Sequence, residues 1–133
     1  MSTQRCIAQI ERIALATSDL ESVCDFYRRL GGVDSPSTER EGDLRACSLD
    51  FCGIRVDVFE RPHGGGVAAN DGRSRRLLHL GFALGSADAV DELSQALEAA
   101  GHRVLEPPHR DRVSGRYESV VLDPDGNRLK LSV

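Results

Sequence analysis

The sequence contains no tryptophan, and only 5% of its residues are aromatic. A site that depends on stacking large flat ligands would therefore have few residues to build it. Positive charge is not in excess either, because the formal net charge is −4. This argues against a nucleic-acid binder, which needs Lys and Arg to displace phosphate counterions. Hydrophobic residues make up 40% of the chain, so we expect a folded domain.

Long apolar runs are missing as well. No segment could span a membrane, and the first residues, MSTQRCIAQIERIA, lack the apolar stretch of a signal peptide. The cysteines form no C-x-x-C pair and lie within apolar patterns; they are Cys6, Cys24, Cys47 and Cys52. We therefore expect buried free thiols in a cytoplasmic protein, with neither a zinc site nor a disulfide framework.

One pattern occurs twice in the chain. The segments Ile10–Gly32 and Leu77–His102 each open with a short apolar strand, pass through a serine, continue as a helix and stop at glycine. Ser18 and Glu21 predict a capping box at the first helix, because each side chain could reach the backbone N–H of the other. Ser86 predicts the cap of the second helix.

Three further strands are expected after each helix. They are Val33–Arg40, Leu44–Phe51 and Ile54–Glu60 in the first half, and His102–Glu106, Tyr117–Leu122 and Arg128–Val133 in the second. The Gly-rich segment Arg61–Arg76 between the halves predicts a linker. We expect one α+β domain over residues 1–133. Its two βαβββ modules, about 7–60 and about 77–133, should complete one another because each is small.

The last strand contains a lysine that needs an explanation. The sequence Asp123–Gly126 predicts a tight turn, and the strand after it alternates between apolar and polar residues. Lys130 lies in the middle of the polar face. A solvated edge strand is one interpretation, since lysine on an edge prevents pairing with another chain.

The whole pattern resembles the vicinal oxygen chelate superfamily of glyoxalases, extradiol dioxygenases, fosfomycin-resistance proteins and bleomycin-binding proteins. The resemblance rests on the doubled βαβββ order, the openings RIALATSDLESVCDFY and HLGFAL, and the ending DPDGNRLKL. The stretch His109–Ser132 is most similar to the fosfomycin-resistance branch and its glyoxalase-domain relatives. The resemblance implies two sheets that curl into a half-open cup, with the helices outside and the ligand on the concave face. It also implies a homodimer.

Strand alternation places four polar residues on faces opposite the helices: Arg12, Asp57, His79 and Lys130. The resemblance implies that these are the positions of the superfamily's metal ligands, usually His, Gln or Glu in place of Arg12 and Glu in place of Lys130. Arginine cannot coordinate a metal, and lysine does so only after losing its proton. We therefore expect no metal; if a divalent metal is held, its ligands are Asp57 and His79. The small residues beside these positions are Ala14, Gly81 and Ala83.

We interpret Lys130 as a replacement for the metal's positive charge. Together with Arg12, and against Asp57, it leaves a net positive site that favours a small anionic partner. A structural Arg12–Asp57 ion pair is the competing interpretation. Tyr117 and Ser119 share a face of their strand, and we expect them to donate hydroxyl groups to the ligand if that face is concave.

Functions of different classes remain open. The first is a binding protein that holds a small anion without metal. The second is a lyase, isomerase, transferase or dioxygenase of the superfamily. In that enzyme His79 and Lys130 would be catalytic, with His79 as general base and Arg12 or Lys130 stabilising an oxyanion. The third is an interaction module with a vestigial cup.

Overall fold

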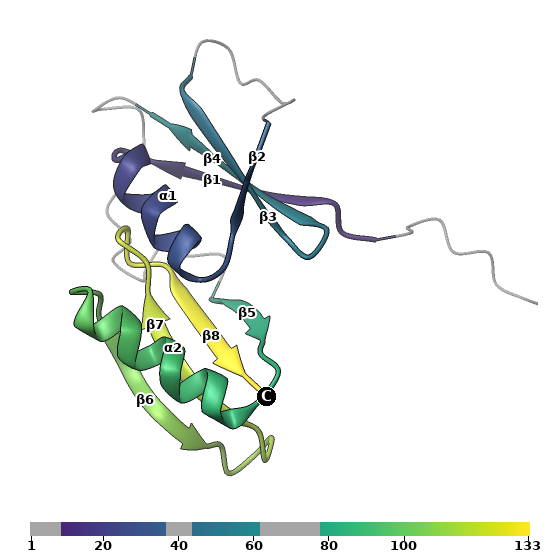
Figure 1. Ribbon diagram of the computed structural model, residues 1–133, viewed down its shortest axis with the longest axis vertical. Helices are drawn as coiled ribbons and strands as arrows, with labels where there is room; N and C mark the ends of the chain where they lie inside the picture. The colour runs from purple at the N-terminus through teal and green to yellow at the C-terminus, as the bar shows by residue number, and fades with distance from the viewer. Residues whose placement is uncertain (1–8, 37–43, 62–77) are drawn as a thin grey trace, which may run out of the picture. The chain divides into compact units, whose positions relative to one another are not determined.

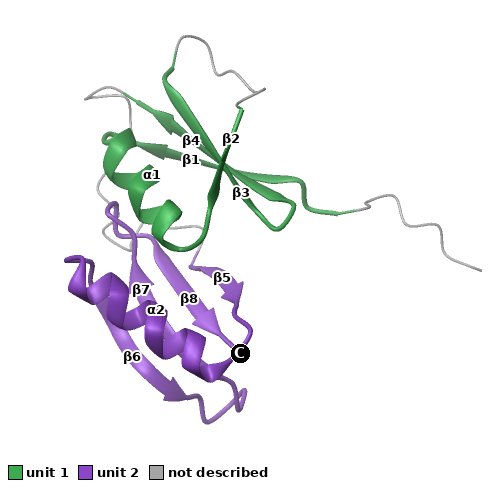
Figure 2. Ribbon diagram, viewed as in Figure 1, with its two compact units in different colours: residues 1–67 green, residues 68–133 purple. Residues whose placement is uncertain are grey.

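The structure is a computed structural model that describes residues 9–36, 44–61 and 78–133. The chain divides into two compact units, residues 1–67 (unit 1) and 68–133 (unit 2), coloured separately in Figure 2. Within the described residues, each unit contains one helix and one four-stranded mixed sheet (Figure 1). Apart from Arg61, the expected linker Arg61–Arg76 lies outside the described residues.

Unit 1 follows the expected βαβββ order. Its elements are β1 (Arg12–Thr17), α1 (Leu20–Arg29), β2 (Val33–Ser35), β3 (Ala46–Phe51) and β4 (Ile54–Glu60). The strand order is β1-β4-β3-β2, with β1 parallel to β4 and the other pairs antiparallel. Helix α1 packs on β3 and β4. Four residues of the helix and three apolar residues of the sheet are buried: Leu20, Val23, Cys24 and Tyr27, with Leu49, Val56 and Val58.

The first turn of α1 differs from the prediction by one residue. Asp19, and not Ser18, is the N-cap, because its carboxylate accepts from the backbone N–H of Ser22 at 3.2 Å. Asp and Ser are equally good caps, and the negative charge of Asp is favoured at the positive end of the helix dipole. The N–H of Leu20, another backbone donor of this first turn, donates to Glu60 Oε2 of β4 at 3.1 Å.

Unit 2 repeats the plan of unit 1. Its elements are β5 (Leu80–Ala83), α2 (Ala87–Ala99), β6 (Val104–Arg110), β7 (Tyr117–Leu122) and β8 (Arg128–Ser132). The strand order β5-β8-β7-β6, with β5 parallel to β8, corresponds to that of unit 1. Ser86 caps α2 as predicted, accepting from the N–H of Ala89 at 3.1 Å. Neither helix in the described ranges is long and apolar enough to cross a membrane.

Strand β6 is longer than predicted and starts later. The sequence predicts His102–Glu106, whereas the strand runs over Val104–Arg110 and includes Pro107 and Pro108. These prolines are tolerated because β6 is the edge strand of its sheet and its pairing with β7 is irregular. The extension places His109 opposite Glu118 of β7.

The described cysteines differ in exposure, so the prediction of buried thiols is correct for Cys24 and wrong for Cys52. Cys24 is buried, Cys47 is intermediate, and Cys52 is exposed in the turn between β3 and β4. Cys6 lies outside the described residues. Burial raises the pKa of the Cys24 thiol.

This contrast predicts an order of thiol reactivity. An alkylating reagent at neutral pH should label Cys52 first and Cys24 last, because Cys24 is both inaccessible and held as the unreactive thiol. Peptide mass spectrometry of timed samples measures the two rates, and the urea-unfolded chain is the control in which both should react alike. Equal rates in the folded protein would contradict the prediction.

Candidate functional site

The sheet face of unit 2 that is turned away from α2 carries a group of charged residues. Lys130 of β8 pairs with Gly81 of β5 on one side and with Val120 of β7 on the other. Glu118 of β7 pairs with His109 of β6. Because paired residues share a face and alternate residues return to it, Lys130, Glu118 and His109 all project from the same face.

Lys130 forms an ion pair with Glu118, which the sequence analysis did not identify. The Lys130 Nζ lies 3.6 Å from Glu118 Oε1, and the two side chains are 35% and 8% exposed. That distance is longer than a hydrogen bond, so the ammonium can still donate to a ligand. Beside it, a Cβ added at Gly81 would meet no atom within 4 Å in the described part of the chain.

The amino-acid composition also singles out Lys130, although the prediction of the site did not use this signal. It is the only lysine among the 17 Lys and Arg residues of this sequence. The other basic residues of this count are arginines, and the arginine guanidinium is planar and weakly hydrated. The one compact ammonium is placed on a half-exposed position of a central strand.

His109, Asp111 and Glu118 form a cluster next to this ion pair. One ligand atom from each lies within 4.8 Å of the others. The Nδ1 of His109 is 2.9 Å from the carbonyl oxygen of Pro107 and must donate to it, since a carbonyl only accepts. The Asp111 carboxylate accepts the backbone N–H of Ser114 at 2.7 Å, which lowers the pKa of Asp111. The sequence did not predict this cluster, because it depends on the length of β6.

Tyr117 and Ser119 share a face as predicted, but that face is covered by α2. The Tyr117 hydroxyl donates to Asp91 Oδ1 at 2.5 Å, and this raises the pKa of Tyr117. The Ser119 hydroxyl lies 2.7 Å from the hydroxyl of Ser94, and both serines are buried. Both hydroxyls thus contact residues of α2, and their role in binding a ligand stays a prediction. The intervening residue, Glu118, projects from the face that carries Lys130.

In unit 1, Arg12 and Asp57 lie on the face away from α1. Register pairs Arg12 with Arg55 and Asp57 with Ala14. Arg12 Nη2 lies 3.2 Å from Glu11 Oε2. Asp57 is 1% exposed and accepts from the Ser48 hydroxyl at 2.5 Å, while its Oδ2 has no hydrogen-bond partner among the described residues. A carboxylate oxygen buried in this way costs free energy unless a ligand group satisfies it.

His79 lies immediately before β5 and not within it. It is an exposed residue. Alternation from Leu80 places it on the same face as Gly81 and Lys130. Because Arg12 and Asp57 belong to unit 1, the expectation that all four residues line one cup stays a prediction.

Comparison with known proteins identifies the family of this chain. Residues 9–131 match the family described as the glyoxalase/bleomycin resistance protein/dioxygenase superfamily. The chain belongs to this superfamily. A curated relative, "Uncharacterized protein PA2024" of Pseudomonas aeruginosa, is 33% identical over 68% of this chain and 80% of its own. The resemblance identified in the sequence is therefore confirmed at the level of the superfamily.

Solved structures of superfamily members have the same fold. A glyoxylase/bleomycin resistance protein/dioxygenase domain from Frankia sp. EAN1pec is 21% identical, with a TM-score of 0.79 over 96% of this chain and 98% of its own. Lactoylglutathione lyase from Agrobacterium tumefaciens is 23% identical, with a TM-score of 0.68 over 96% and 95%. The superfamily member described here thus has the α+β paired-module, glyoxalase-like fold that the sequence predicts.

Proposed function

We propose that this superfamily member binds a small anionic molecule through Lys130, without a metal at the superfamily's usual positions. The observation that carries the proposal is the half-exposed ammonium of Lys130, which contacts Glu118 at 3.6 Å and faces the open surface beside Gly81. An ammonium on such a partly buried surface attracts an anion at hydrogen-bond distance more strongly than it would in water, and the Glu118 carboxylate 3.6 Å away cancels part of this attraction. The exposed ring of His79 on the same face offers a further hydrogen bond.

The chemistry of the donor set supports a metal-free site at these positions. Arg12 has no lone pair for a metal, and its guanidinium lies against Glu11. Lys130 is paired as a cation with Glu118. Asp57 and His79 would be left as ligands, and two ligands make a weak site. No step of the proposed function therefore runs through a metal at these four positions.

The enzyme alternative stays a prediction from the sequence. It would use His79 as general base and Lys130 to stabilise an oxyanion, and both project from one face of unit 2. We also propose that the protein belongs to the fosfomycin-resistance branch of the superfamily, because the stretch His109–Ser132 resembles that branch in sequence. One structural neighbour is described as a lactoylglutathione lyase, but at this identity the likeness concerns the fold.

Replacing Lys130 by methionine tests the proposal. Phosphate, phosphonate and carboxylate ions are screened against the full chain by thermal shift, and the best ligand is titrated by calorimetry. We expect Lys130→Met to weaken its binding by about tenfold or more, because a charge-assisted hydrogen bond contributes about 1.5–3 kcal/mol. Lys130→Arg keeps the charge and should retain part of the affinity.

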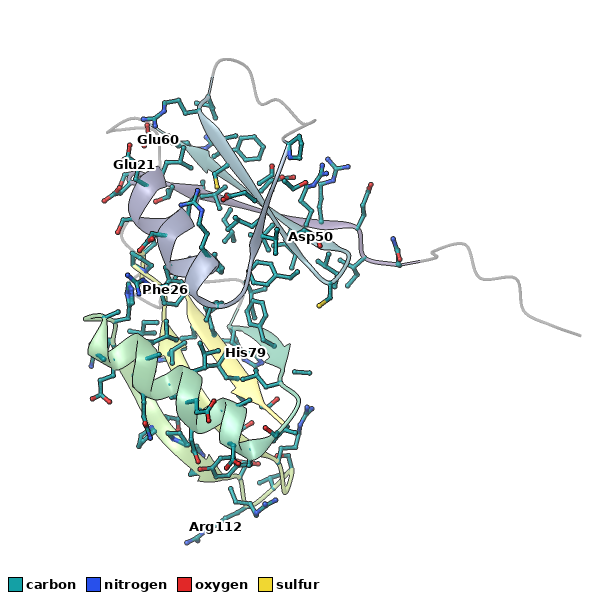
Figure 3. The ribbon with its side chains drawn as sticks, viewed as in Figure 1. Glu21, Phe26, Asp50, Glu60, His79 and Arg112 are labelled. Atoms are coloured by element: carbon teal, nitrogen blue, oxygen red, sulfur yellow. The ribbon has the colours of Figure 1, made fainter. Side chains whose placement is uncertain are left out.

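Arg112→Met is the matched control, since it removes one positive charge from an exposed loop (Figure 3). It should leave the affinity unchanged. If no ion in the panel stabilises the wild-type chain, or if Lys130→Met binds the best ion as tightly as Arg112→Met does, the proposed anion site is wrong.

A further inference from the structure

We propose that His109, Asp111 and Glu118 form a binding site for a divalent transition-metal ion, at positions different from those where the superfamily resemblance predicts its ligands. All three residues belong to unit 2, and their ligand atoms lie within 4.8 Å of one another. They come from the end of β6, the turn after it and the start of β7. The site does not depend on the proposed anion.

The imidazole of His109 has the tautomer and the ring orientation that metal binding needs. Its Nδ1 donates a hydrogen bond to the Pro107 carbonyl at 2.9 Å, which leaves the lone pair on Nε2. This is the arrangement found around metal-binding histidines, where the second ring nitrogen donates to a carbonyl or carboxylate that fixes the tautomer and orients the ring. Pro107 is not itself a member of the cluster, so this contact is independent of the spacing of the three ligand atoms.

The two carboxylates are constrained in different ways. The Oδ2 of Asp111 accepts the N–H groups of Val113 at 3.1 Å and Ser114 at 2.7 Å, which hold the side chain in place and leave Oδ1 for an ion. Glu118 is 6% exposed, and a carboxylate so deeply buried requires a cation. In this structure Lys130 supplies that cation from 3.6 Å.

The charges of the group favour a cation. Asp111 and Glu118 carry two negative charges, and Lys130 carries one positive charge, so a divalent ion would find a net attraction at the cluster. One imidazole nitrogen with two carboxylate oxygens suits first-row ions such as Mn²⁺ and Zn²⁺, which keep open positions for water or a ligand oxygen. Lys130 competes with the ion for Glu118, so its removal should strengthen metal binding.

Calorimetric titration of the full chain with Mn²⁺ and with Zn²⁺ tests the site. We expect one equivalent to bind the wild type, and Glu118→Gln and His109→Gln to weaken that binding by at least about tenfold. Glu106→Gln is the matched control, because Glu106 is an exposed carboxylate on β6 outside the cluster. Lys130→Met should bind the ion more tightly while it loses the anion, so the two proposals fail separately.

A second measurement uses unmutated protein and does not depend on the folding of variants. Reductive ¹³C-methylation labels Lys130 as the only lysine of the sequence, besides the terminal amine. Mn²⁺ bound at the cluster should broaden the Lys130 methyl signal at about one equivalent, because Lys130 Nζ lies 3.6 Å from Glu118 Oε1, whereas diamagnetic Zn²⁺ should not. The proposal is overturned if neither ion binds the wild type, if Glu118→Gln binds as tightly as Glu106→Gln, or if one equivalent of Mn²⁺ leaves the Lys130 methyl signal sharp.

Discussion

Replacing Leu131 by alanine is expected to lower the free energy of unfolding by about 2–5 kcal/mol. Leu131 is fully buried in β8, a central strand of unit 2, where it pairs with Phe82 of β5 and Ser119 of β7. Its side chain packs on the α2 side of the sheet. The truncation removes buried apolar area and leaves a cavity that the neighbouring strands can fill only in part.

Urea denaturation followed by circular dichroism measures this loss. Leu78→Ala deletes the same atoms from a residue that is 72% exposed, so it should change the free energy of unfolding by no more than about 0.5 kcal/mol. A loss of less than about 1 kcal/mol for Leu131→Ala would contradict the packing described for β8. Leu131 adjoins Lys130, so a core residue and a residue of the proposed anion site follow one another in the same strand.

The second large effect is expected at Ser119. Ser119→Ala should lower the free energy of unfolding by about 1–3 kcal/mol, because it leaves the buried hydroxyl of Ser94 without its partner at 2.7 Å. Anion binding should be unchanged, since Ser119 lies on the α2 side of the sheet and Lys130 on the other side. Denaturation and anion titration of the same variant measure both results.

The double variant Ser94→Ala/Ser119→Ala is the control for this interpretation. Removing both hydroxyls leaves no unsatisfied group, so the double variant should be less destabilised than the sum of the single variants. Additive losses would show that the two hydroxyls do not depend on one another. If Ser119→Ala binds the anion more weakly than the wild type, Ser119 contributes to the anion site.

Local sequence signals predicted the elements that depend on nearby residues. The bounds of Ile54–Glu60 and Tyr117–Leu122 match the structure because their alternation ends at clear turn residues. Ser86 was correctly identified as a cap, since capping depends on the next three residues. The cap of α1 was misplaced by one residue because Ser18 and Asp19 are both good caps, and no local rule chooses between them.

The length of β6 could not be predicted in the same way. Pro107 and Pro108 are typical of a strand end, and they are compatible with a strand here only because β6 lies at the edge of the sheet. Edge position is a property of the whole sheet. As a result the predicted strand ends at Glu106, short of His109, and the pairing of His109 with Glu118 was not predicted.

The sequence by itself determined the doubled βαβββ plan, the superfamily and the face from which Lys130 projects, because these depend on periodicity and on local turns. Only the tertiary structure decided which groups surround that lysine. The register of β6, β7 and β8 brings Glu118 and His109 to the face of Lys130, and it turns Tyr117 and Ser119 towards α2. Register joins residues that are distant in sequence, so local patterns do not encode it.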